Sequence, residues 1–180
     1  PTASTKALGN YQLRVYTNGS SSPTTVTLPS GNLAAGATVV YKNASATAYS
    51  GPATSLTNVV WNGNDAIALF NTNSGQNVDI FGRIGNDPGT AWTLSGNTTV
   101  DKTLRRKPSV LAGVTVNPTG TGPSAFVTLG TEWNQFNIDV VSGLGAHSVN
   151  AQGNAVTLTV TDVNGNSSTC SATVTVQDNV

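Results

Sequence analysis

The chain is poor in charge and nearly lacks several residue types that build catalytic and metal sites. Only 9% of its 180 residues are charged, the formal net charge is zero, and there are one Cys, one His and no Met. A single Cys excludes an internal disulfide, and one Cys with one His excludes a structural zinc site. Balanced charge excludes an overall positive field for nucleic acid, so we expect no nucleic-acid partner. No apolar run reaches the roughly 20 residues of a membrane helix, so we expect no membrane insertion.

What the chain has instead is Thr, Asn, Ser and Gly, with apolar residues recurring at every second position in short runs. This period and the turn residues between the runs predict an all-β fold, a sandwich or a barrel. The expected strands are residues 11–17, 24–28, 38–42, 55–61, 65–71, 77–84, 103–107, 126–129, 136–141, 155–162 and 169–177. Residues 88–101 and 108–130 are rich in Gly, Pro and Thr and are expected to form long loops.

The last two runs predict a β-hairpin with one apolar face. They flank an Asn164-Gly165 turn, which is a strong hairpin signal. The alternating apolar set is Val156, Leu158, Val160, Cys170, Ala172, Val174 and Val176. Because an isolated hairpin is marginal in water, this face must be covered, and we expect it to mediate assembly. Cys170 is in phase with the apolar set, which favours a buried small residue over a cysteine that lacks its disulfide partner.

The middle of the chain carries motifs that resemble the bacterial branch of the lamin tail domain family. They are WNGNDAIAL at 61–69, VDIFGRIG at 78–85, NDPG at 86–89, TLRRKP at 103–108, Glu132-Trp133 and GLGAH at 143–147. The resemblance covers residues 1–147 and implies an immunoglobulin-like β-sandwich, found in bacteria in secreted proteins, with no established catalytic residues. Pro1-Thr2 resembles the turn after the family's first strand, so we expect that strand to be absent. Residues 148–180 form an additional C-terminal β-hairpin, similar to the final hairpin of bacterial hyalin-type repeats.

The residues that hydrolytic enzymes use are too few and too scattered to indicate catalysis. His147 is the only histidine, and no G-x-S-x-G nucleophile motif is present. We therefore expect no enzyme activity and assign structural roles to the charged residues. Asp65 is expected to cap a turn. Either Arg105 or Arg106 is expected to pair with Asp101 or Glu132, while the other stays in solvent.

Two ligand classes stay open. Asp162, Asn164 and Asn166 alternate as calcium-loop ligands do, although Asn and Asp are also ordinary turn residues. No cofactor is required, and calcium is a possible one. Trp92 and Trp133 flank the long loops, where with Asp87 they can bind carbohydrate or simply cover one end of the fold. Trp61 lies in phase with its strand and is expected in the core.

The sequence thus favours a noncatalytic, extracellular structural or adhesive module of a bacterial surface protein, which assembles through β-strand edges. The hairpin either adds strands to a neighbouring copy, as in a homo-oligomer or filament, or folds back as one of several neighbouring domains of a larger protein. The alternative from a different class is a carbohydrate- or calcium-binding accessory domain of a secreted enzyme.

Overall fold

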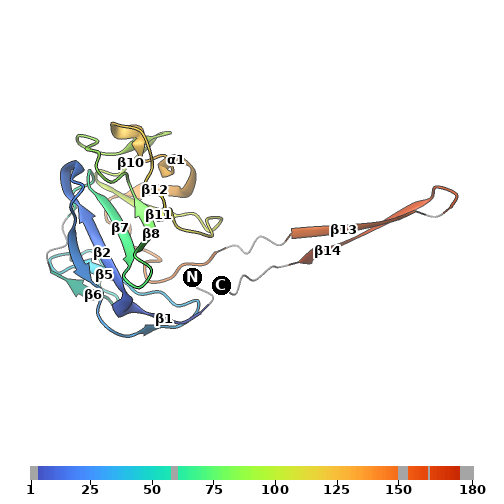
Figure 1. Ribbon diagram of the computed structural model, residues 1–180, viewed down its shortest axis with the longest axis horizontal. Coiled ribbons are helices and arrows are strands. Elements are labelled where there is room, and N and C mark those ends of the chain that lie inside the picture. The colour runs from blue at the N-terminus through green and yellow to red at the C-terminus, as the bar shows by residue number, and fades with distance from the viewer. Residues whose placement is uncertain (1–3, 58–60, 150–153, 162, 175–180) are drawn as a thin grey trace.

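A computed structural model describes residues 4–57, 61–149, 154–161 and 163–174. The fold is all-β, as predicted, and consists of several small, mostly antiparallel sheets (Figure 1). The strands are β1 (Lys6–Ala7), β2 (Tyr11–Tyr16), β3 (Thr24–Thr27), β4 (Asn32–Leu33), β5 (Tyr41–Asn43), β6 (Thr54–Leu56), β7 (Ala66–Asn71), β8 (Gln76–Phe81), β9 (Thr93–Leu94), β10 (Asn97–Thr98), β11 (Lys102–Arg106), β12 (Trp133–Asn137), β13 (Asn154–Thr161) and β14 (Ser167–Val174). The helices are short: η1 (Leu8–Asn10), η2 (Thr17–Gly19), η3 (Pro123–Ala125) and α1 (Leu129–Glu132).

The largest sheet has four antiparallel strands in the order β3-β2-β7-β8. In its register Leu13 lies opposite Leu69, and Tyr16 lies opposite Ala66. Alternation therefore puts Leu13 and Val15 on one face of the sheet and Tyr16 on the other. Val15 and Tyr16, at the end of β2, are both buried, so the sheet is covered on both sides there.

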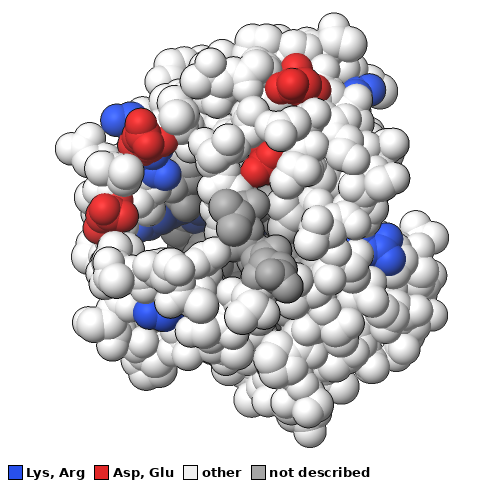
Figure 2. Space-filling model, turned by 90° about the vertical axis from the view of Figure 1, so that its left-hand side faces the viewer, with Lys and Arg blue, Asp and Glu red and all other residues white. Residues whose placement is uncertain are grey.

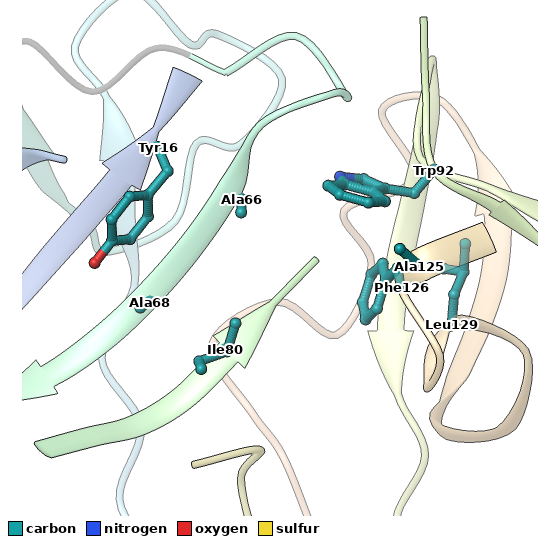
Figure 3. Close-up of a cluster of buried hydrophobic side chains, with 8 residues drawn as sticks. All are labelled: Tyr16, Ala66, Ala68, Ile80, Trp92, Ala125, Phe126 and Leu129. Carbon is teal, nitrogen blue, oxygen red and sulfur yellow. The ribbon is translucent and has the colours of Figure 1, made fainter. Parts of the chain in front are cut away.

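One core cluster joins three of these strands to the two segments that were predicted to be long loops, residues 88–101 and 108–130. Tyr16, Ala66, Ala68 and Ile80 from the sheet gather with Trp92, Ala125, Phe126 and Leu129 (Figure 3). The aromatic rings meet edge to face, with centroids 4.6 Å apart for Phe81 and Phe126 and 6.3 Å apart for Trp92 and Phe126. These geometries are favourable for aromatic pairs. Residues outside the sheet therefore contribute as much to this core as the strands do.

The smaller sheets are two-stranded. β11 pairs with β12, β9 with β10 and β1 with β4, all antiparallel, whereas β5 and β6 are parallel. A second cluster of Val15, Leu28 and Leu56 packs near β5 and β6, with Tyr41 and Leu69 against it. The immunoglobulin-like sandwich implied by the family resemblance stays a prediction.

Several predicted strands are shifted and one is wrong. Residues 126–129 form no strand, because Phe126 follows η3 and α1 begins at Leu129. The strands expected at 136–141 and 38–42 lie instead at 133–137 and 41–43. Residues 58–60 of the strand expected at 55–61, and the Pro1-Thr2 turn, lie outside the described residues.

The C-terminal hairpin is formed as predicted and extends away from the rest of the molecule (Figure 1). β13 and β14 form a two-stranded sheet, and among the described residues neither pairs with any other strand. Each is eight residues long, so the arm extends for about 26 Å at the usual rise per residue. We call β13, β14 and the turn between them the arm.

Candidate functional site

The arm carries alternating apolar residues on one face, and the described side chains of that face are exposed. Its register sets position 156 opposite 172, 158 opposite 170 and 160 opposite 168, so these positions share one face. Leu158 is 62% exposed. The prediction that Cys170 is buried is wrong for the single chain, since its thiol is exposed. For Val156, Val160, Ala172 and Val174 the strand position is described but the side chain is not, and Val176 lies outside the described residues.

A second feature is an apolar groove on the body of the molecule, with a volume of about 600 Å³. We call it the apolar groove; it is lined by Lys6, Leu8, Tyr11, Leu13, Leu28, Leu33, Val39, Tyr41, Trp61, Leu69, Asn71 and Val78. Lys6 is the only charged residue among them. Val39 and Val78 are partly exposed, which shows that the groove opens to solvent. Sequence reasoning missed this groove because its walls come from segments far apart in the chain.

The tryptophans are placed only partly as predicted. Trp92 is 0% exposed, which contradicts the ligand-binding role predicted for it and fits the alternative, that it covers one end of the fold. Trp61, expected in the core, is 46% exposed. Trp133 is half-buried with its ring 5.3 Å from that of Phe81, and its indole Nε1 has no hydrogen-bond partner. The third predicted ligand residue, Asp87, accepts a hydrogen bond from the Gly89 N–H at 2.8 Å, which is turn geometry.

The aromatic residues define a hollow beside the groove. Trp61, Phe81 and Trp133 line a cavity of about 540 Å³, together with the acidic Asp101 and Asp139. Both aspartates have positive φ, at 52° and 59°, and lie in turns. Aromatic and carboxylate side chains therefore meet here, and not around Trp92 and Asp87 as the sequence suggested.

Two of the charged residues expected to be structural, Asp65 and Glu132, have the predicted roles. Asp65 is buried, and its Oδ1 accepts a hydrogen bond of 3.0 Å from the Asn18 N–H, which caps the η2 turn as predicted. Glu132 pairs with Arg106 at 2.9 Å, also as predicted. Asp101 instead lies in the turn before β11. Arg105, expected in solvent, donates to the Val140 carbonyl at 3.1 Å.

The partner that the sequence did not reveal is Asp79. Arg106 bridges Asp79 on β8 and Glu132 at the end of α1, which ties β11 to the large sheet. Burial by itself lowers the pKa of Arg106, but hydrogen bonds and charge from Asp79 and Glu132 outweigh it and raise the pKa above its ordinary value. Asp79 also accepts the Val114 N–H at 2.8 Å. One cluster of three charges therefore fastens two strands, a helix end and a loop.

The other predicted polar sites are not assembled by the described residues. Asn164 and Asn166 are exposed in the turn of the arm, and Asp162 lies outside the described residues, so calcium binding stays a prediction. Within residues 4–57, 61–149, 154–161 and 163–174, no group of three or more His, Cys, Asp or Glu side chains is placed to hold a metal. His147 is exposed. No helix in the same ranges has the length and apolarity to cross a membrane.

Charge on the face opposite the arm is sparse and mixed (Figure 2). Most of this face is uncharged, and acidic and basic side chains lie side by side near a hollow at one edge. Intermixed charge gives no field of one sign over this face, so recognition here would depend on shape and apolar contact.

Comparisons of the chain with protein-family models, with curated proteins and with solved structures found no match. The resemblance to lamin tail domains and hyalin-type repeats therefore stays a prediction from the sequence motifs.

Proposed function

We propose that this protein is a noncatalytic structural or adhesive subunit of an extracellular bacterial surface, and that it assembles with neighbouring chains through β-strand edges. The observation that carries the proposal is the arm. Its described side chains are exposed throughout, and they include Leu158, Val163 and Cys170.

The physics of a lone hairpin supports this role. Two strands without a third strand or a covering layer are at best marginally stable in water. Their outer edges carry unpaired N–H and C=O groups, which are a template for pairing with another chain. Strand addition satisfies these groups, and the alternating side chains set the register. The arm is therefore in its most stable environment when another chain covers it.

The composition supports the setting of the proposed function. Thr, Ser, Asn and Gly in place of charge, together with the lamin-tail-like and hyalin-like motifs, are typical of secreted bacterial surface proteins. An arm and an acceptor at different places on one chain make a heterologous contact. Such contacts generate rings or open filaments, which suits a structural protein.

Replacing Leu158 with aspartate tests the proposed function. The substitution puts a charge at the centre of the arm's apolar face, far from the core of the body, so assembly should weaken by about 30- to 100-fold. The matched control is Thr159→Asp, which adds the same charge at the next exposed position on the opposite face. Light scattering after size exclusion, over a range of concentrations, measures the mass. A wild-type chain that stays monomeric at high concentration would contradict the proposal.

A carbohydrate-binding accessory domain is the second candidate. The half-exposed Trp61 and the carboxylates of Asp101 and Asp139 around one hollow favour it. An exposed aromatic face flanked by hydrogen-bonding groups suits a sugar ring. Trp61→Ala should then abolish binding in a glycan screen while Trp92 remains folded in the core. Absence of any glycan binding by the wild-type protein removes this candidate.

A further inference from the structure

We propose that the apolar groove is the acceptor for the arm, and that it receives the apolar face of the arm from a second copy of this chain. The inference depends on the proposed function, and it names the partner and the place of contact.

The floor of the groove belongs to the large sheet. Leu13 and Leu69 lie directly opposite each other on β2 and β7, so their side chains form one apolar pair. Val78 adds to this floor from β8, next to an irregularity in the pairing with β7 between Leu69 and Phe70. The groove thus runs across the face of the sheet, where the apolar face of an added pair of strands can pack, while the edges of that pair stay available for strand addition.

The opposite wall comes from the segment between β3 and β5. Leu28, Leu33 and Tyr41 line it, and Leu28 is buried. Partial burial in this wall raises the pKa of the Tyr41 phenol above its ordinary value. A groove with apolar walls on both sides and an open mouth leaves its lining partly hydrated, and filling it with apolar side chains is favourable.

The arm has the matching chemistry. Residues 154–161 and 167–174 contain no charged side chain. The groove contributes only Lys6, whose long aliphatic stem can pack while its ammonium reaches water. Contact between these two surfaces therefore buries no charged group. The other face of the arm carries Thr157, Thr159, Thr161 and Thr169, and its hydroxyl groups suit a solvent-facing side.

Geometry favours a second copy over the same chain. The arm extends outward from the body, so its central positions 158 and 170 lie away from the body's own surface (Figure 1). Each copy then offers one arm and one groove at different places. Such a contact is heterologous and repeats from copy to copy, which gives head-to-tail chains.

The single cysteine makes the contact directly testable. Cys170 shares the apolar face with Leu158 and is exposed. The donor is the wild-type chain, and the acceptor is a tagged chain that carries Val78→Cys together with Cys170→Ser. The control acceptor carries Val127→Cys with Cys170→Ser, at a half-exposed valine beside Phe126 that does not line the groove. After mixing and mild oxidation, the donor and the Val78→Cys acceptor should form a disulfide-linked pair at least tenfold faster than the control pair. Equal rates would overturn the inference.

A second measurement does not depend on disulfide geometry. Val78→Glu and Val39→Glu place a charge in the groove at positions that are already partly exposed, with Val127→Glu as the control. Both groove variants should weaken assembly at least tenfold, and the control should not. If Leu158→Asp weakens assembly but the groove variants do not, the arm assembles elsewhere, so this inference fails while the proposed function stands. If the wild-type chain does not assemble at all, both fail.

A third outcome concerns the single chain. Val78→Cys with Cys170 retained gives one chain both thiols. In a dilute solution this variant should stay reduced, because its own arm does not reach its groove. A rapid internal disulfide would show that the chain's own arm occupies the groove, and would overturn the inference.

Discussion

Replacing Trp92 with alanine should lower the free energy of unfolding by about 3–5 kcal/mol, the usual cost of removing a large aromatic side chain from a core. Trp92 has no exposed surface, packs edge to face on Phe126 and donates from its indole Nε1 to the Asp65 carbonyl at 3.4 Å. Its backbone N–H also donates to the Thr99 Oγ1 at 3.0 Å, so the whole residue is fixed in place.

Denaturant unfolding of the two proteins, followed by circular dichroism, measures this loss. The control is Trp61→Ala, because the same side chain is removed from a half-exposed site. The control should lose no more than about 1 kcal/mol, as surface substitutions usually do. Equal losses for the two variants would show that burial of Trp92 in the core contributes no more to stability than the half-exposed Trp61 does.

The position of Trp92 also changes how binding experiments must be interpreted. A loss of glycan binding on Trp92→Ala would follow from unfolding of the end of the core, where Trp92 meets η3 and α1. Such a result would say nothing about contact with a sugar. Trp61 is the residue whose removal tests contact, because it lies at the surface of the hollow.

Strands with long, strict alternation could be predicted from the sequence. β2, β8, β13 and β14 have this pattern, and the predicted ranges overlap them closely. β7 is a continuous apolar run and was found from the turn residues on either side of it. Residues 126–129 failed because a four-residue apolar run does not distinguish a strand from other buried structure. Phe126, which directly follows η3, and Leu129, the first residue of α1, are both buried in the core. The short pairs β1–β4 and β9–β10 carry too few residues to show any period.

Of the candidate site, the arm could be predicted from the sequence and the groove could not. The arm is local in sequence, so its alternation and its turn were visible. The groove joins Leu8, Leu33, Trp61 and Val78, which are brought together only by the fold. The ion cluster of Asp79, Arg106 and Glu132 shows both cases. An Arg partner for Glu132 could be predicted, because the chain has few charged residues. The part played by Asp79 could not, because it lies on another sheet. Aromatic residues in loops were the least predictable, since both burial and exposure satisfy a tryptophan.

Replacing Arg106 with alanine should lower the free energy of unfolding by about 3 kcal/mol, because it leaves two carboxylates without their cation. The value is at the lower end of the usual range, since the side chains of Asp79 and Glu132 are 32% and 22% exposed and water can reach them. The matched control is Arg105→Ala on the neighbouring strand position. Arg105 donates to a carbonyl and a hydroxyl and stacks on Phe136, so its loss should cost about 1 kcal/mol.

A double-mutant cycle separates repulsion between the stranded carboxylates from loss of packing. Arg106→Ala made in an Asp79→Asn background leaves only one carboxylate beside the empty position, and the neutral amide can still hydrogen bond. The cost of Arg106→Ala should therefore fall by at least 1 kcal/mol in that background, within the range of coupling between contacting residues. An unchanged cost would mean that Arg106 stabilises the protein through packing, including the contact of its guanidinium group with the Trp133 ring at 5.1 Å, and that the two carboxylates contribute little. Since Arg106 links β11 to β8, the result also decides whether charge or apolar contact holds these two sheets together.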